Sequence, residues 1–243
     1  MPLVDKNAYH DFALVYDEMM RGIDYPSWVD YVLSLYQSYA SVEQSDTPLS
    51  LLDLACGTGS FITLMQAKGW GVTGVDQSSS MLAIAEKELR ELFVGEKFPL
   101  ITCLCDSLNY ILSPLHLQKT LERVYDHLIP GGIFIADLNS PFKYHEILGD
   151  NTYSSAFENS AYIWSNYFAP ESKLCRMEID FFHRQQGELF RHFKEVHWQR
   201  LYEVREIEDL ATKVGFREVR NFGAFTLNPY TPQDERIFYL FTR

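Results

Sequence analysis

The sequence has few basic residues, few cysteines and no long apolar run. Its 21 Lys and Arg residues face 33 Asp and Glu residues, which gives a formal net charge of −12. Non-specific binding to nucleic acid depends on Lys and Arg that neutralise phosphates, so this balance argues against a nucleic-acid partner. No apolar run approaches the roughly 20 residues of a transmembrane helix, and the sequence therefore predicts no membrane span.

The four cysteines are not spaced like a zinc site or a disulfide framework. They are Cys56, Cys103, Cys105 and Cys175. We expect Cys103 and Cys105 to alternate along one buried strand as small core residues. The first twenty residues carry four carboxylates among their apolar positions, which disfavours a secretory signal. These features predict a reduced, cytoplasmic protein without a metal site.

The length of 243 residues suits one α/β domain with a modest insertion. We expect a helical lid over residues 1–45 and a ligand-binding core over residues 46–150. Residues 151–202 are expected to form an antiparallel β insertion. Residues 203–243 are expected to supply a helix and the last two strands of the core sheet.

The stretch LLDLACGTGSF, residues 51–61, predicts a strand, a glycine turn and a helix. Its leucines form a short apolar run, which is typical of a strand buried in a parallel sheet. The two glycines allow a tight turn and a close approach of the backbone to a ligand. Ligands of open α/β sheets bind outside the carboxyl ends of the strands. The candidate ligand-binding residues here are Asp53, Ala55, Cys56, Gly57, Thr58 and Gly59.

A second apolar run, WGVTGVD, ends in Asp76, seventeen residues after Gly59. A carboxylate at the tip of the second strand is placed to hydrogen-bond the two hydroxyls of a ribose. The expected ligand therefore contains a nucleoside. A helix follows over residues 78–93, with Ser78 or Ser79 as its cap and Leu89 among its inner residues.

The motifs DLACGTG and VDQSSSML resemble the first two motifs of class I S-adenosylmethionine-dependent methyltransferases. The resemblance implies a Rossmann-like, seven-stranded-type sheet with helices on both faces, and S-adenosylmethionine as the cofactor. It adds Gln77, Ser78, Met81, Cys105 and Asp106 to the expected cofactor contacts. A dinucleotide-binding dehydrogenase is the weaker interpretation, because Ile62 stands where that fingerprint needs a third glycine.

The sequence departs from this family after the second strand. Family members usually continue with a third strand, whose acidic end contacts adenine, and another helix. Here only residues 94–97 separate the expected helix from the next strand, FPLITCLC. We expect the third strand to be missing or shortened, and the adenine contacts to be the least defined part of the site.

The remainder of the core follows the family pattern. After the strand FPLITCLC, the resemblance places Asn109 and Tyr110 near the acceptor, although turn formation is the commoner role of such an asparagine. A helix is expected from Ser113-Pro114 to the turn at Pro130-Gly131-Gly132. His116 and His127 on this helix are expected to be surface or packing residues.

Residues 151–202 contain three β-rich runs, which predict an antiparallel meander. The insert is similar to that of bacterial sugar-amine N-methyltransferases, and this resemblance implies that residues 151–202 form the acceptor side of the site. Alternation along RHFKEVHWQRLY puts Glu195 and His197 on one face and His192 on the other. His197 with Glu195 could be a general base with its orienting carboxylate, and His192 is the competing candidate. Alternatively, His197 is a hydrogen-bonded core residue.

The N-terminal segment, residues 5–20, predicts a short amphipathic helix. It either packs on the core or covers the cofactor as a lid, with Tyr9 and Tyr16 as the covering residues. A second helix is expected from Ser27, with Trp28 near the acceptor.

These patterns predict transfer of a methyl group to a nitrogen or oxygen of a small-molecule acceptor. The alternatives are a methyltransferase-like protein that binds the cofactor without activity, and an RNA or protein methyltransferase. The sequence contains no signal of the oligomeric state.

Overall fold

A computed structural model of the chain describes residues 9, 11–42, 49–85 and 96–243. Within these ranges the core is a six-stranded sheet, sheet A, in the order β2-β1-β3-β4-β10-β9. The first four strands in that order are parallel, and β10 pairs antiparallel with β4 and β9. Its strands are β1 (Ser50–Leu54), β2 (Gly71–Val75), β3 (Phe98–Cys103), β4 (Leu128–Asn139), β9 (Glu218–Gly223) and β10 (Arg236–Thr242).

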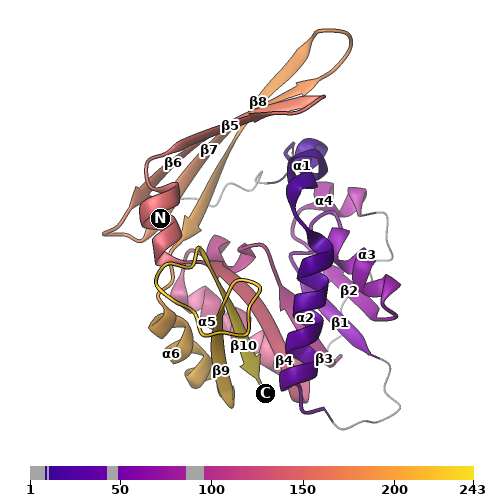
Figure 1. Ribbon diagram of the computed structural model, residues 1–243, viewed down its shortest axis with the longest axis vertical. Helices are drawn as coiled ribbons and strands as arrows, with labels where there is room; N and C mark the ends of the chain where they lie inside the picture. Colours follow the sequence, from indigo (N-terminus) through magenta and orange to yellow (C-terminus); the bar gives the residue numbers. More distant parts are fainter. Residues whose placement is uncertain (1–8, 10, 43–48, 86–95) are drawn as a thin grey trace.

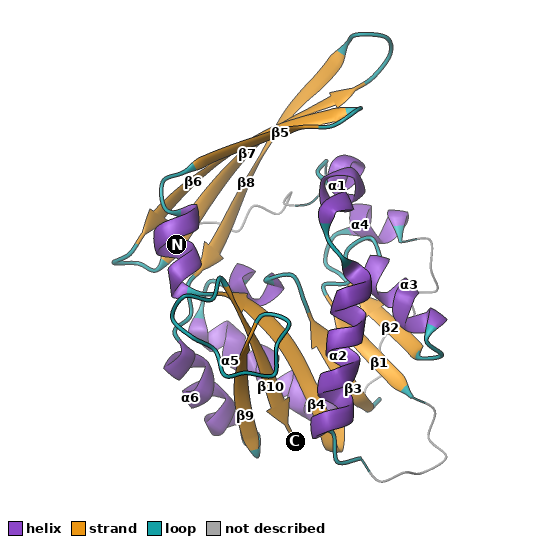
Figure 2. Cartoon of the chain, viewed as in Figure 1, coloured by secondary structure: helices purple, strands orange, loops and turns teal. Residues whose placement is uncertain are grey.

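Helices cover both faces of sheet A (Figure 2). On one face, α2 (Tyr25–Tyr39) and α3 (Ser60–Ala67) pack their apolar stripes on the strands. On the other face lie α5 (Pro114–His127) and α6 (Val204–Val214). Burial of these two apolar layers is the main favourable term in folding. The architecture is the predicted Rossmann-like α/β fold.

The third strand that is usual in the methyltransferase family, and that we expected to be missing or shortened, is not present among the described residues. The strand β2 is the last strand on its side of sheet A. The helix after Asp76 is α4 (Ser79–Ile84), and the side chain of Ser78 caps it by accepting from the Met81 N–H at 3.2 Å. Residues 86–95, which include Leu89 of the expected helix, lie outside the described ranges. The core sheet therefore has six strands in the part of the chain that the structure describes.

Two helix starts differ from the sequence-based expectation. The first helix, α1 (Ala13–Met19), begins well after residue 5, and the backbone at Tyr9 is left-handed with φ 64°. A short 3₁₀ helix, η1 (Met20–Gly22), follows it. The second helix, α2, begins at Tyr25 and not at Ser27, because the Asp24 side chain accepts from the Ser27 N–H at 3.2 Å and so caps the helix earlier.

The strand β3 ends at Cys103, so the expectation that Cys105 continues it is wrong. The backbone is left-handed at Cys105 and Asp106, with φ 57° and 51°, which breaks the extended conformation. Cys103 is buried as expected, but Cys105 is only partly buried. The turn brings η2 (Ser107–Tyr110) over the carboxyl end of the sheet.

The insertion forms a second sheet, sheet B, as an antiparallel meander of four strands, one more than the three expected runs. A π-helical segment, η3 (Lys143–Leu148), leads into it. Sheet B lies across one end of the molecule, and its last strand packs against η2 (Figure 1). Its strands are β5 (Thr152–Ala156), β6 (Ser160–Ala169), β7 (Leu174–Arg184) and β8 (Phe190–Arg200).

No helix in the described ranges is both long enough and apolar enough to cross a membrane.

Gly74 in β2 tests the packing of this strand against the glycine turn. A Cβ at this position would lie 2.9 Å from Cys56 Sγ and 3.1 Å from Ile62 Cδ1. We expect Gly74→Ala to destabilise the fold by about 1–3 kcal/mol through overpacking. At Gly71 in the same strand a Cβ would meet only the Leu49 carbonyl oxygen, at 3.6 Å, so Gly71→Ala is the matched control. Equal urea midpoints for the two variants would contradict the prediction.

Candidate active site

The turn between β1 and α3 holds the Asp76 carboxylate. The backbone is left-handed at Ala55, Gly57 and Gly59, with φ of 57°, 56° and 84°, which folds the chain back towards β2. The Gly57 N–H donates to Asp76 Oδ2 at 2.9 Å, and the Ser78 N–H donates to Oδ1 at 2.8 Å. The carboxylate therefore points at the turn, as ribose binding by Asp76 requires.

Asp53, at the carboxyl end of β1, is a buried acid with a raised pKa. Burial raises its pKa to about 7, the Thr102 hydroxyl opposes this by donating to it at 2.5 Å, and the charge of Asp76 adds to the rise. Among the described residues, no basic side chain forms an ion pair with Asp53. A nearby positive charge favours ionisation of a buried carboxylate. The site therefore fits the cationic sulfonium and ammonium groups of S-adenosylmethionine.

A cavity of about 1010 Å³ extends from the glycine turn to η2 and the N-terminal segment. Ligand pockets are typically about 300–1,000 Å³, so this cavity has room for a cofactor and a small acceptor. Most of the predicted cofactor-binding residues line it. They are Tyr9, Tyr16, Asp53, Ala55, Cys56, Gly57, Thr58, Asp76, Gln77, Met81 and Cys105, and the predicted acceptor residue Tyr110 joins them.

Two of the predicted cofactor residues do not line the cavity but form contacts that hold its wall. Gly59 is the N-cap of α3, and its carbonyl accepts from the Thr63 hydroxyl at 2.7 Å. Ser78 caps α4, and its hydroxyl also donates to the Tyr9 carbonyl at 2.9 Å. Both residues therefore position the neighbouring cavity wall.

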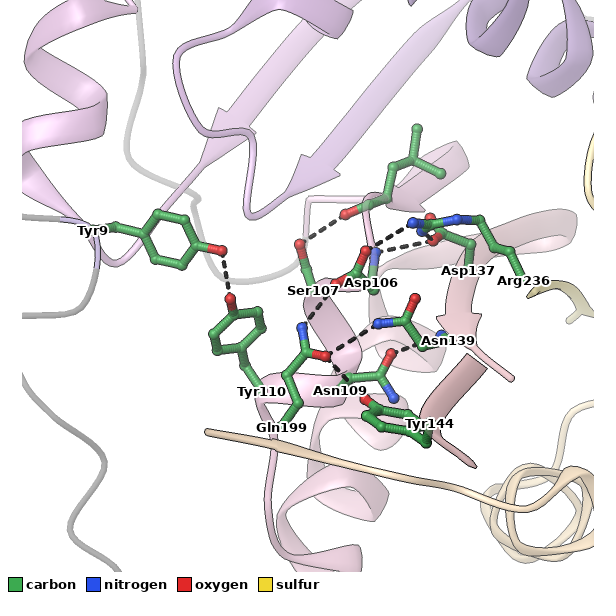
Figure 3. Close-up of polar contacts among 11 residues, drawn as sticks. Tyr9, Asp106, Ser107, Asn109, Tyr110, Asp137, Asn139, Tyr144, Gln199 and Arg236 are labelled. Atoms are coloured by element: carbon green, nitrogen blue, oxygen red, sulfur yellow. Dashed lines mark hydrogen bonds and ion pairs between the residues drawn. The ribbon is translucent and has the colours of Figure 1, made fainter. Parts of the chain in front are cut away.

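The side chain of Asp106, a predicted cofactor contact, joins a polar network and is not among the residues that line the cavity (Figure 3). It accepts from Arg236 Nη2 at 2.9 Å and from Gln199 Nε2 at 2.7 Å. Arg236 also pairs with Asp137, which is fully buried and accepts from the Asp106 N–H at 2.9 Å. This network joins the ends of β3, β4 and β10 to β8 of sheet B.

Two predicted acceptor residues also belong to the framework and not to the cavity lining. Asn109 is fully buried and donates to the Arg200 carbonyl at 2.8 Å. It accepts from the Asn139 N–H at 3.0 Å (Figure 3). Trp28 is buried against Phe238, with the Arg236 guanidinium 5.4 Å from its ring centroid. The side-chain amide of Asn109 and the ring of Trp28 therefore contact other groups of the protein.

The N-terminal segment covers the cavity and is fixed on both sides. Towards the core, the Thr58 hydroxyl donates to Asp17 at 2.6 Å. Towards sheet B, the Tyr9 and Phe12 N–H groups donate to the Glu195 carboxylate at 2.8 and 2.9 Å. Tyr9 and Tyr16 lie against the cavity, so we call residues 9 and 11–19 the lid. That this segment opens and closes over the cofactor stays a prediction.

The histidine candidates on β8 occupy different environments. His197 is 1% exposed, and its Nε2 lies 3.0 Å from Oε2 of Glu195, which is itself buried. It lies behind Tyr110 and is not part of the cavity lining. His192, the competing candidate, is exposed on the opposite face of sheet B and pairs with Asp180 at 2.7 Å.

Three residues of the cavity wall were not predicted from the sequence. Tyr25 lines it at the start of α2, and His116 and Thr120 line it from α5. The Tyr25 position follows the Asp24 cap, which is a recognisable signal. His116 lies one turn into a helix, where periodicity alone does not separate a cavity-facing histidine from a surface one.

Comparisons with known proteins find similarity to methyltransferases. A family model described as a methyltransferase domain matches residues 27–220. YqeM of Bacillus subtilis, which carries a provisional methyltransferase name, is 32% identical over 95% of each chain. The crystal structure of an S-adenosylmethionine-dependent methyltransferase from Clostridium acetobutylicum superposes with a TM-score of 0.80 at 32% identity, covering 97% of this chain and 99% of the other.

A third relative has a named substrate. The dTDP-3-amino-3,4,6-trideoxy-α-D-glucopyranose N,N-dimethyltransferase of Streptomyces venezuelae is 27% identical, over 85% of this chain and 90% of that protein.

Asp53 should make cofactor affinity depend on pH. Its pKa of about 7 means that the free site is partly protonated at neutral pH, whereas a bound cation favours the carboxylate. We expect S-adenosylmethionine affinity to rise from pH 6 to pH 8, with proton release on binding at the lower pH. Asp53→Asn should lower affinity at pH 8 by about tenfold or more and remove the pH dependence. Calorimetry in two buffers measures both effects.

The control for Asp53 is Asp30→Asn, because Asp30 is exposed and pairs with Lys68 on the surface. A pH dependence that persists in Asp53→Asn would assign it to another group.

Glu195 should hold the lid closed in a pH-dependent way. Burial opposes its ionisation, but hydrogen bonds from His197 and from the Phe12 and Tyr9 N–H groups prevail and hold its pKa below 4.5. The lid contact should therefore persist above pH 4.5 and weaken as the pH falls further. Glu195→Gln should raise hydrogen exchange of residues 11–19 by roughly 10- to 100-fold at neutral pH.

Glu178→Gln is the matched control for the lid, since Glu178 lies on neighbouring β7 and pairs with Lys194 at the surface. Unchanged exchange in Glu195→Gln would show that other contacts hold the lid.

Proposed function

This chain belongs to the S-adenosylmethionine-dependent methyltransferases, and we propose that it methylates a nitrogen atom of a small amine. Amino sugars are the first acceptor class to test. The Streptomyces venezuelae relative is named as an N,N-dimethyltransferase of an amino sugar. It matches 85% of this chain, and 90% of its own length is covered. Its identity of 27% leaves the particular acceptor of this chain to experiment.

The position of the cavity is the observation that carries this proposal. Tyr9 from the lid, Tyr110 from η2 and Leu174 from sheet B line the same space as the glycine turn. An acceptor in this space would therefore lie between the lid, η2 and the cofactor. A volume of about 1010 Å³ suits a cofactor with one small molecule better than it suits a folded RNA or a protein segment.

The charges of the wall favour an amine over a phosphate. Among the described residues that line the cavity, the acidic side chains are Asp53 and Asp76, and neither Lys nor Arg occurs. Phosphate recognition ordinarily uses Arg or Lys. The negative wall also supports the expectation that RNA is not the acceptor.

The work of this chain is to bind, orient and exclude water. S-adenosylmethionine supplies a methyl group already activated by the sulfonium charge. Asp53 and Asp76 would hold its cationic and ribose parts, and the tyrosines of the lid would separate the reacting atoms from bulk water. The acceptor nitrogen then needs alignment and a route for its proton. The same assembled groups speak against a degenerate protein that only binds the cofactor.

Transfer of label from methyl-labelled S-adenosylmethionine tests the proposal. The panel consists of free amino sugars, dTDP-linked amino sugars, simple aliphatic amines, sugar alcohols, total RNA and a protein extract. We expect label to enter an amine, with S-adenosylhomocysteine released in equal amount. Label that enters only RNA, protein or a hydroxyl compound would refute the proposed acceptor class.

A further inference from the structure

A chain of hydrogen bonds leads from the cavity wall to a buried carboxylate. The Tyr9 and Tyr110 hydroxyl oxygens are 2.7 Å apart, and the Tyr110 hydroxyl lies 3.2 Å from His197 Nδ1 (Figure 3 shows the first contact). His197 Nε2 lies 3.0 Å from Glu195 Oε2. Each of the four side chains therefore lies within hydrogen-bonding distance of the next.

The ends of this chain lie in different environments. Tyr9 and Tyr110 line the cavity, whereas His197 and Glu195 are 1% and 6% exposed and lie behind it. The edge of the His197 ring also meets the Tyr9 ring, with centroids 4.9 Å apart and an interplanar angle of 90°. Solvent has almost no access to the imidazole, so the two phenols are its connection to the cavity.

The polar groups around His197 favour one direction of proton transfer. A carboxylate can only accept, so Glu195 takes the Nε2–H of the neutral ring and leaves Nδ1 free to accept from Tyr110. The other neighbours are Phe12 from the lid and Met177 from β7, which carry no charge. Beyond Tyr110, the Asp106 carboxylate is held by Arg236. Burial raises the pKa of Tyr9 and of Tyr110, so both phenols stay neutral.

We propose that Tyr9 and Tyr110 pass the acceptor's proton to His197, which Glu195 stabilises as an imidazolium. This inference rests on the proposed function, since it requires an acceptor with an N–H. In this scheme Tyr9 and Tyr110 contact the acceptor, and His197 and Glu195 are positioning residues that act through them.

The step balances in atoms and charge. The acceptor nitrogen forms a bond to the methyl carbon, and the carbon–sulfur bond breaks with its electron pair kept by sulfur. The nitrogen then loses a proton to the Tyr9 oxygen, the Tyr9 proton moves to Tyr110, and the Tyr110 proton moves to His197 Nδ1. One positive charge has moved from the cofactor to the imidazole beside Glu195.

The lid is part of this relay. Glu195 Oε2 accepts from the Tyr9 N–H at 2.8 Å as well as from His197, and Oε1 accepts from the Phe12 N–H at 2.9 Å. Tyr9 itself supplies the first hydroxyl. The relay is therefore complete only when the lid is closed, so proton removal is confined to the state that excludes water.

One test reads the tautomer of His197 without an acceptor. In protein with ¹⁵N-labelled histidine and bound S-adenosylhomocysteine, a long-range ¹H–¹⁵N spectrum reports both ring nitrogens. We expect a proton on Nε2 and none on Nδ1, with the Nδ1 resonance shifted by Tyr110→Phe. Tyr167→Phe is the control, because Tyr167 is exposed on β6. A proton on Nδ1 at neutral pH would overturn the relay, because Tyr110 could then only accept.

The second test measures turnover of the panel amine that the wild-type protein methylates fastest. Tyr110→Phe and His197→Gln should each lower kcat by about 100-fold, with the S-adenosylhomocysteine Kd nearly unchanged. Glutamine keeps a donor and an acceptor but takes up no proton, so wild-type kcat in His197→Gln would overturn the relay. His192→Gln, on the same strand but facing solvent, is the control and should retain kcat.

The two proposals fail in different ways. If the wild-type protein methylates no amine of the panel, the proposed function fails, and the tautomer measurement still decides whether the relay geometry exists. If methylation occurs and either variant keeps full kcat, the relay alone fails.

Discussion

The buried Glu195 carboxylate is the group on which the closed arrangement depends. It accepts hydrogen bonds from His197 and from two backbone N–H groups of the N-terminal segment, at distances of 2.8 to 3.0 Å. A buried charge without such partners costs several kcal/mol, so the insertion and the N-terminal segment stabilise each other. The acceptor side of the cavity is therefore assembled from segments more than 180 residues apart in sequence.

A second carboxylate organises the cofactor side in the same way. Asp76 accepts from two backbone N–H groups, one in the glycine turn and one at the start of α4. Its charge thereby fixes two loops whose backbone polar groups would otherwise lack partners. The site is thus held at two points, by Asp76 on sheet A and by Glu195 on sheet B, with the lid tied to both halves through Thr58 and Glu195.

The sequence was informative where a residue type has few possible roles. The glycine turn, Asp76, the lack of a third strand among the described residues and the alternation along β8 follow from backbone freedom, strand periodicity and segment length. The sequence did not predict that Asp106, Asn109 and Trp28 contact other protein groups beside the cavity, because a polar or aromatic side chain at a strand or helix end can turn to either side. Arg236, more than 120 residues later, decides the direction of Asp106. No local pattern reveals such a partner, and the same holds for the left-handed Tyr9.

The short strand β2 has a consequence for association between copies of the chain. It is the outer strand of sheet A in the described ranges. Outer strands can template intermolecular β-pairing and fibril growth when they are long and exposed. With five residues, two of them glycine, β2 would be a poor template for such pairing.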